Sequence, residues 1–437
     1  MVRRKHDNAA TVAIAAIVLF TCAGQPARAQ IALPGPGLPN LPAGVTGRLP
    51  LDSALGSVRQ NMEETLAAPS RLRGLIRQSR GALQPDPLGW PVVTGEIIAI
   101  GLSTPARHQA LREGFTILRE EQMASLDLTA LVLAPPRRLS LSRAIDRLSR
   151  WDPGADITFN HIHTPAGVMT ASRSIPVASA SSPPAGARLG LIDTGVLATH
   201  PAFAGSRIVQ RGFAGAPRAE THGTAVASLL VGRAGVFSGA FPQTDLLVAD
   251  VYGGQPTGGS STGLAQALAW MAEQGVGVVN VSLVGPRNSL VERAVARARA
   301  RGVVIVAAVG NDGPAAPPLY PASYEDVVGV GAVNARSRIL PESGRGPQVD
   351  FTAPGAEMAA AAQGGGWTSV RGASFASPLV AGMIARNGGG ASAVTSLVRS
   401  AQDLGAPGRD PVFGHGLVGA ALRVEPGSVT ARGRLAR

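Results

Sequence analysis

Apolar residues along the chain follow two different patterns, which change near residue 186. Between residues 92 and 163, short apolar runs alternate with stretches that are apolar at helical spacing. The runs predict strands, and the stretches predict helices, in the order β-α-β-β-α-β, which is a recurring small α+β unit. The predicted strands cover residues 96–100, 115–118, 126–133 and 157–162, and the helices cover 104–114 and 140–151.

After residue 186, the apolar runs become continuous, as in strands that are buried on both faces. Amphipathic helices separate them, and this alternation predicts an α/β fold: a doubly wound, mostly parallel sheet with helices on both faces. The strands are predicted at residues 189–192, 245–251, 276–282, 303–308 and 327–333. The helices are predicted at residues 222–231, 262–274, 290–301, 375–386 and 392–404.

The start of the chain has the pattern of an export signal. Three basic residues at 3–5 precede an apolar run over 9–24, and the triplet 27–29 (Ala-Arg-Ala) has the small-x-small form of a cleavage site. The run is shorter than the roughly 20 residues of a membrane span. We expect an exported protein, secreted or periplasmic, with no membrane attachment after signal cleavage; an uncleaved anchor is the alternative.

These patterns divide the 437 residues into six segments. They are a signal peptide (1–29), a Pro-rich linker with an amphipathic helical part (30–90), a small α+β domain (91–163), a flexible linker (164–185), a large α/β domain (186–425) and a basic tail (426–437).

Composition narrows the function classes. The formal charge is +12, but the arginines are scattered and few aromatic residues lie among them, so no nucleic-acid partner is expected. The single cysteine, Cys22, falls in the predicted signal, which leaves the mature chain without disulfides or a cysteine nucleophile. His161 and His163 alternate on a predicted strand without a third ligand nearby, so a surface pair is expected rather than a metal site.

Three residue types needed for nucleophilic catalysis occur in distinctive local contexts. Asp193 ends a buried strand, His222 opens an apolar helix, and Ser374 lies in the sequence Gly-Ala-Ser-Phe-Ala-Ser-Pro at the start of another helix. A serine hydroxyl needs an imidazole to take its proton, and the imidazole needs a carboxylate on its other nitrogen. Asn311 follows a further buried strand, where its amide could donate to an oxyanion.

With these motifs in order, residues 186–425 resemble the catalytic domain of the subtilisin-like serine peptidases. The matching segments are 193–195, 222–224, 280–283, 310–313, 349–355 and 372–378. The resemblance implies Ser374 as nucleophile, His222 as general base and acid, Asp193 as its orienting partner and Asn311 as oxyanion donor. Residues 92–163 resemble the family's propeptide, a ferredoxin-like module that assists folding and then blocks the cleft.

The resemblance also implies a substrate-binding set. These residues are Ser282, Leu283, Val284, Gly285 and Gly310. Many relatives have glycine where Val284 stands, and a β-branched side chain there should narrow the cleft, so we expect a preference for small side chains in the primary pocket.

No cofactor is expected for the chemistry. Residues 232–241, where the family's calcium loop usually lies, hold no carboxylates, so we expect that structural calcium site to be missing, while weaker calcium sites elsewhere stay open.

The sequence therefore predicts an exported serine endopeptidase that acts on polypeptide substrates through an acyl-enzyme. It would be made as a precursor that its own prodomain inhibits, and we expect a monomer. The alternatives are a catalytically silent binding protein on the same fold, an esterase or peptide ligase that uses the same site, and, if residues 1–29 are retained, a membrane-anchored scaffold.

Overall fold

The computed structural model describes residues 69–166, 175–176 and 189–430. Four predicted segments lie wholly or partly outside the described residues. They are the signal peptide with Cys22, segment 30–90 as far as residue 68, most of the linker 164–185, and the last seven residues of the tail. The predictions for those segments stay predictions.

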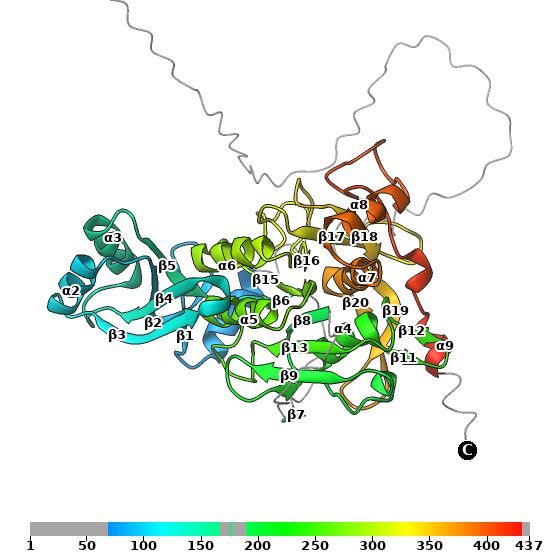
Figure 1. Cartoon of the computed structure of the whole chain (residues 1–437), viewed down its shortest axis with the longest axis horizontal. Coiled ribbons are helices and arrows are strands. Elements are labelled where there is room, and N and C mark those ends of the chain that lie inside the picture. The colour runs from blue at the N-terminus through cyan, green and yellow to red at the C-terminus, as the bar shows by residue number, and fades with distance from the viewer. Residues whose placement is uncertain (1–68, 167–174, 177–188, 431–437) are drawn as a thin grey trace, which may run out of the picture. The chain divides into compact units, whose positions relative to one another are not determined.

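The first described part is an antiparallel sheet with two helices (Figure 1), and we call it the N-terminal module (residues 69–166). Its strands run in the order β1-β2-β4-β3, and β5 pairs with the other edge of β2. The elements are β1 (Leu83–Pro85), β2 (Pro91–Ile100), α2 (Thr104–Arg112), β3 (Thr116–Met123), β4 (Leu128–Ala134), α3 (Leu141–Trp151) and β5 (Asp156–His161). From β2 onward the elements follow the predicted β-α-β-β-α-β order.

The sheet of this module is buried on both faces because its strands alternate. On β2, Ile97 and Ala99 belong to the small core beneath α2 and α3, whereas Ile98 and Ile100 join the core of the rest of the chain. One face of the module is therefore covered by its own helices, and the other packs on the second sheet's helices α5 (Ser261–Glu273) and α6 (Ser289–Ala300).

The second sheet has seven strands, all paired in parallel, in the order β18-β17-β16-β14-β8-β13-β9. We call residues 189–430, which contain it, the parallel-sheet domain. The five predicted strands form its middle, and β9 and β18 complete the two edges. The strands are β8 (Leu189–Asp193), β9 (Ile208–Gly212), β13 (Leu246–Asp250), β14 (Val278–Val281), β16 (Val304–Ala308), β17 (Val328–Val333) and β18 (Phe351–Pro354).

Two pairs of helices cover this sheet. Helix α4 (Thr221–Val231) packs on α7 (Ala373–Arg386), and α5 packs on α6. Helix α8 (Gly390–Ser400) ends four residues before the predicted end at 404. The prediction was wrong there because Gln402 forms an antiparallel bridge with Leu417, which requires extended backbone.

Short strands complete the domain. They are β7 (Ile175–Pro176), β10 (Arg218–Ala219), β11 (Arg233–Ala234), β12 (Phe237–Ser238), β19 (Ala356–Ala361) and β20 (Trp367–Arg371), with the short helix α9 (Pro426–Thr430) near the end. Strands β11 and β12 form a tight hairpin within the stretch that lacks carboxylates.

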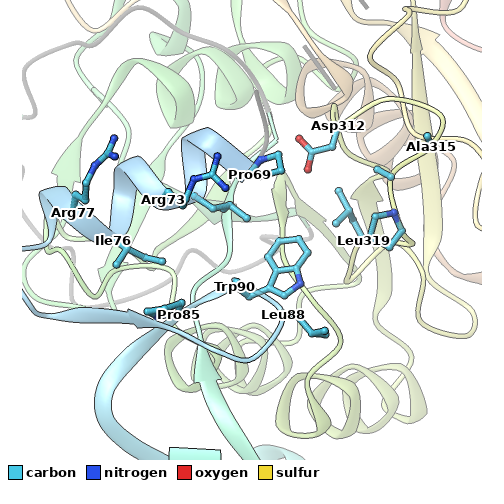
Figure 2. A pocket seen from close by; sticks show the side chains of 14 residues that line it. Pro69, Arg73, Ile76, Arg77, Pro85, Leu88, Trp90, Asp312, Ala315 and Leu319 are labelled. Atoms are coloured by element: carbon cyan, nitrogen blue, oxygen red, sulfur yellow. The ribbon is translucent and has the colours of Figure 1, made fainter. Parts of the chain in front are cut away.

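Residues 69–78 form a helix that lies beside the loop after β16. Arg71 forms an ion pair with Asp312 at 2.8 Å. Next to this contact is a mostly apolar hollow of about 880 Å³, and Trp90, Leu319 and Asp312 are among the residues that line it (Figure 2). Within the described residues, no helix combines the length and apolarity that a membrane span requires.

Candidate active site

The three predicted catalytic side chains meet at one edge of the parallel sheet. Asp193 is the last residue of β8, and His222 and Ser374 are each the second residue of a helix, α4 and α7 respectively. Since parallel strands all point their carboxyl ends the same way, the chain leaves β9 and β18 at that edge and enters α4 and α7 there after short connecting strands. Side chains that are 29 and 152 residues apart in the sequence are thereby brought together.

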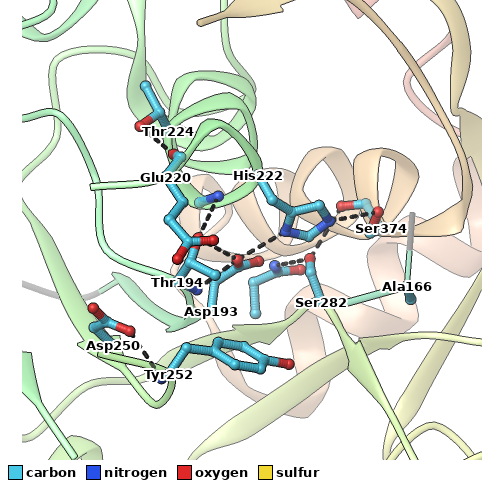
Figure 3. Close-up of polar contacts among 12 residues, drawn as sticks. Ala166, Asp193, Thr194, Glu220, His222, Thr224, Asp250, Tyr252, Ser282 and Ser374 are labelled. Atoms are coloured by element: carbon cyan, nitrogen blue, oxygen red, sulfur yellow. Dashed lines mark hydrogen bonds and ion pairs between the residues drawn. The ribbon is translucent and has the colours of Figure 1, made fainter. Parts of the chain in front are cut away.

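Their polar atoms form a continuous chain of hydrogen bonds (Figure 3). The Oδ1 atom of Asp193 lies 2.8 Å from Nδ1 of His222, and Nε2 of His222 lies 3.0 Å from Oγ of Ser374. A carboxylate can only accept, so Nδ1 carries the proton, and Nε2 is left to accept the serine hydroxyl. Asp193 and Ser374 are fully buried, and the His222 ring packs against Phe375.

The fourth predicted residue, Asn311, forms a notch with the start of α7. Its Oδ1 accepts the backbone N–H of Ala373 at 2.9 Å, which turns its Nδ2 toward the carbonyl oxygen of Ala166. The backbone N–H of Ser374 donates to the same oxygen at 3.1 Å. Gly372, with φ of 136°, allows the chain to enter α7 at this angle. Two donors thus converge on one carbonyl oxygen beside the serine hydroxyl.

That carbonyl belongs to a strand that runs from the N-terminal module into the cleft. After β5, the chain forms β6 (Thr164–Pro165), which pairs antiparallel with β15 (Leu283–Val284). The N–H of His163 donates to the carbonyl of Gly259 at 2.7 Å, and the N–H of Ala166 donates to that of Ser282 at 3.0 Å. We call residues 162–166 the cleft strand. Part of the predicted linker 164–185 is therefore ordered β-structure.

The predicted substrate-binding residues line this strand. Leu283 and Val284 pair with it through the backbone, and the Ser282 hydroxyl donates to the carbonyl of Ser374 at 3.0 Å. Gly285 needs to be glycine, because a Cβ there would lie 2.6 Å from Cδ2 of His163. The structure thus brings all nine predicted site residues to the cleft or its walls, Gly310 being described next.

Leu319 is a residue of the cleft that the sequence analysis missed. A Cβ on Gly310 would lie 2.5 Å from Cδ1 of Leu319 and 3.7 Å from Cγ1 of Val284, so the two side chains flank Gly310. Both are almost fully buried, at 3% and 4% exposure, and Ala166 is buried at 2%. Leu319 follows a Pro-rich loop with no periodic pattern, so no signal in the sequence could have placed it beside Gly310.

His161 and His163 correct another prediction. Both were expected on the surface, but they are 5% and 0% exposed, because the parallel-sheet domain covers the strand that carries them. His161 Nε2 pairs with Asp86 at 3.2 Å, and its Nδ1 lies 3.1 Å from the amide of Asn288. Neither ring nitrogen of His163 has a hydrogen-bond partner among the described residues.

Further carboxyl groups lie near Asp193. Asp250 ends β13 in register with Asp193 on β8, and burial raises its pKa although three backbone N–H groups bond to it. Burial, together with the charges of Asp250 and Asp193, also raises the pKa of Glu220. Three carboxyl groups, those of Asp193, Glu220 and Asp250, therefore lie near one another at this edge of the sheet. Within the described ranges, no group of three or more His, Cys, Asp or Glu side chains is arranged to hold a metal ion, and the calcium prediction stays untested.

Two proteases from other organisms are similar in sequence to about half of this chain. M-protease of Shouchella clausii (strain KSM-K16) is 33% identical over 246 residues, which cover 53% of this chain and 64% of that protein. Subtilisin DY of Bacillus licheniformis is 33% identical over 210 residues, covering 46% of this chain and 76% of that protein. The chain thus spans just under two thirds of the length of M-protease and about three quarters of that of subtilisin DY.

The fold has a counterpart among solved structures. Fervidolysin from Fervidobacterium pennivorans, described as a keratinolytic enzyme related to subtilisin, matches with a TM-score of 0.60 over 76% of this chain and 61% of its own. At 18% identity this match shows a likeness of fold. The model of the subtilase family matches residues 185–416, just over half of the chain. The chain therefore belongs to the subtilase family.

Proposed function

We propose that this chain is a serine endopeptidase that hydrolyses peptide bonds through an acyl-enzyme and is made as a self-inhibited precursor. One observation carries the proposal. The carbonyl oxygen of Ala166 accepts hydrogen bonds from Asn311 Nδ2 and the Ser374 N–H, beside a serine hydroxyl that is itself bonded to His222. A peptide carbonyl in this position is polarised and lies next to a nucleophile whose proton has an acceptor.

The first half of the reaction forms the acyl-enzyme. The Oγ of Ser374 attacks the carbonyl carbon while Nε2 of His222 takes its proton, and the carbonyl oxygen becomes an oxyanion held by Asn311 and the Ser374 N–H. Asp193, bonded to Nδ1, stabilises the imidazolium that forms. The imidazolium then gives its proton to the leaving amine as the C–N bond breaks.

The second half releases the acid product. A water molecule loses a proton to Nε2 of His222 and attacks the ester carbonyl, and the oxyanion forms again in the same notch. The ester C–O bond breaks, and His222 returns the proton to Ser374. Since the notch stabilises charge in both halves, its donors contribute to both steps.

The cleft strand makes the chain its own first substrate. The bond whose carbonyl lies in the notch joins Ala166 to Gly167, so we place self-cleavage there. Backbone pairing of β6 with β15 would hold the new carboxyl end in the cleft after cleavage, and the N-terminal module would act as an inhibitor. The polar contacts of the module with α5 and α6 support this role, among them Ser125 to Ala269 at 2.6 Å.

The walls of the primary pocket define the substrate class. Leu319 and Val284, both almost fully buried, flank Gly310, and the residue whose carbonyl lies in the notch is the small, buried Ala166. We therefore propose that the enzyme cleaves polypeptides after small residues. Export through the signal segment and a monomeric state remain part of the proposal.

A single experiment tests the catalytic proposal. The purified full chain and its Ser374→Ala variant are treated with a fluorophosphonate probe, and their N-termini are sequenced. We expect the wild type to be labelled on Ser374 and to yield a chain that begins at Gly167, while the variant shows neither.

The same experiment, with ester and peptide hydrolysis assayed on the labelled and unlabelled protein, separates the alternatives. Wild-type protein that takes no label would favour a silent binding protein. Labelled protein that hydrolyses ester but not peptide substrates would favour an esterase. An N-terminus that retains residues 1–29 in both proteins would favour a membrane-anchored scaffold.

A further inference from the structure

His163 is the most deeply enclosed residue of the cleft strand. Its side chain is 0% exposed and lies against Gly285, where even a Cβ would collide with its ring. Its backbone is held on both sides, since its N–H donates to Gly259 and its carbonyl accepts the Tyr252 hydroxyl at 2.7 Å. The ring therefore cannot leave its pocket unless the strand moves.

The pocket offers this ring no side chain of the described residues with which it could form a hydrogen bond. Nδ1 and Nε2 are both buried without a hydrogen-bond partner among the described residues. His161, two residues earlier, differs: Asp86 accepts from its Nε2, and Asn288 donates to its Nδ1. A buried imidazole that gains a proton needs an acceptor for each N–H, and an unpaired buried charge is strongly unfavourable.

We propose that His163 makes the hold of the cleft strand on the active site sensitive to pH, so that mild acid protonates its imidazole and releases the strand from the cleft. This inference rests on the proposed function only in treating the strand as an inhibitor. The release itself requires no catalysis.

Among the groups that face His163, only the backbone of Gly259 favours a proton on its ring. His161 lies on its own strand, and Tyr252, from the loop after β13, is a phenol whose pKa burial raises well above the usual value, so it stays uncharged. Gly259 and Gly285 carry no side chain. No carboxylate of the described residues pairs with the ring. Burial, reinforced by the neighbouring His161 and only partly opposed by the Gly259 backbone, lowers the pKa of His163 from 6.5 to about 3.

The direction of the effect follows from linkage. The bound ring has the lower pKa, so the hold of the strand is complete above the pKa of the free histidine, about 6.5, and weakens as the pH falls below it. With a bound pKa of about 3, the opening constant of the strand should rise about 30-fold between pH 7.5 and pH 5.0.

Amide hydrogen exchange in the full-length Ser374→Ala chain tests this without any contribution from catalysis. The N–H groups of residues 163 and 166 report opening of the strand, since both are bonded across the cleft, and the N–H of Leu191 in β8 reports global unfolding. After correction for intrinsic exchange rates, we expect opening at residues 163 and 166 to rise about 30-fold from pH 7.5 to pH 5.0. The N–H of Leu191 should not follow.

Variants make the test specific. His163→Phe and His163→Leu are each added to the Ser374→Ala chain. In both, the rise of the opening constant between pH 7.5 and pH 5.0 should fall below about threefold, because neither the Phe nor the Leu side chain can be protonated. In His161→Gln, the full rise of the opening constant should persist. An unchanged opening constant with His163 present, or an equal rise in both His163 variants, would overturn the proposal. Failure of the wild type to cleave itself would leave this result intact and would count only against the proposed function.

Discussion

The N-terminal module and the parallel-sheet domain are both mixed α and β structures, yet the candidate chemistry lies in only one of them. In the parallel sheet, every strand points its carboxyl end to the same edge, and Asp193, Ser282 and Asn311 lie at or just beyond such ends. The antiparallel sheet of the module has no such edge, because neighbouring strands point in opposite directions.

The two regions also differ in how they are held. The parallel sheet is enclosed by its own helices, whereas the module meets the rest of the chain through apolar residues such as Ile98 and through polar contacts such as Asn288 to the carbonyl of Phe159 at 2.9 Å. Under the proposed self-cleavage, the reacting groups would stay with the parallel-sheet domain, and the module would be the part that leaves the cleft.

Among variants that test this division between the two regions, removal of the nucleophile should lower activity the most. We expect Ser374→Ala to lower hydrolysis of an alanine-containing chromogenic peptide by about 10⁶-fold, which is the scale of this loss in subtilisin itself. Ser369→Ala, which changes an exposed serine on β20, should retain full activity. Substantial activity in Ser374→Ala would mean that the reacting group lies elsewhere.

A smaller loss is expected from the oxyanion notch. Asn311→Asp keeps an acceptor for the N–H of Ala373 but removes the amide donor, so kcat should fall by at least about 10²-fold, the lower end of the range known for such a donor in subtilisin. KM should change little, because the interaction strengthens in the transition state. Asp312→Asn is the matched control, and a kcat within tenfold of wild type in Asn311→Asp would contradict the assignment.

Next in size is the effect on specificity. Leu319→Ala should enlarge the primary pocket and raise kcat/KM for peptides with phenylalanine before the cleaved bond by about 10- to 200-fold relative to alanine peptides. Val236→Ala, at an exposed residue in the turn between β11 and β12, should leave this ratio unchanged. Equal cleavage after phenylalanine and alanine by the unaltered enzyme would refute the role of Leu319.

The smallest effect belongs to the contact between the helix at 69–78 and the loop after β16. Arg71 is 46% exposed, so its pair with Asp312 is screened by solvent and should contribute less than about 1 kcal/mol. Arg71→Ala should change the half-time for appearance of the chain beginning at Gly167 by less than about fivefold, as should Arg107→Ala on α2. A change of a hundredfold would make this helix an essential part of the inhibitor.

Much of the chain could be read from its sequence because the decisive information was local. The continuous apolar runs identified the five inner strands, and the residues around Asp193, His222 and Ser374 identified the triad, since each needs a particular strand end or helix start. The edge strand β9 was missed, as its sequence, Ile-Val-Gln-Arg-Gly, mixes apolar and polar residues at a partly covered edge.

Only the tertiary structure decided which residues occupy the cleft. The sequence around Ala166, His163 and Leu319 does not indicate that these residues lie in the cleft. Their burial and their hydrogen-bond partners depend on which distant segments pack against them. The sequence by itself determined the kinds of elements and the reacting groups. The folded chain determined that residues 162–166 lie across those groups, that the His163 ring has no hydrogen-bond partner among the described residues, and that Leu319 lies beside Gly310.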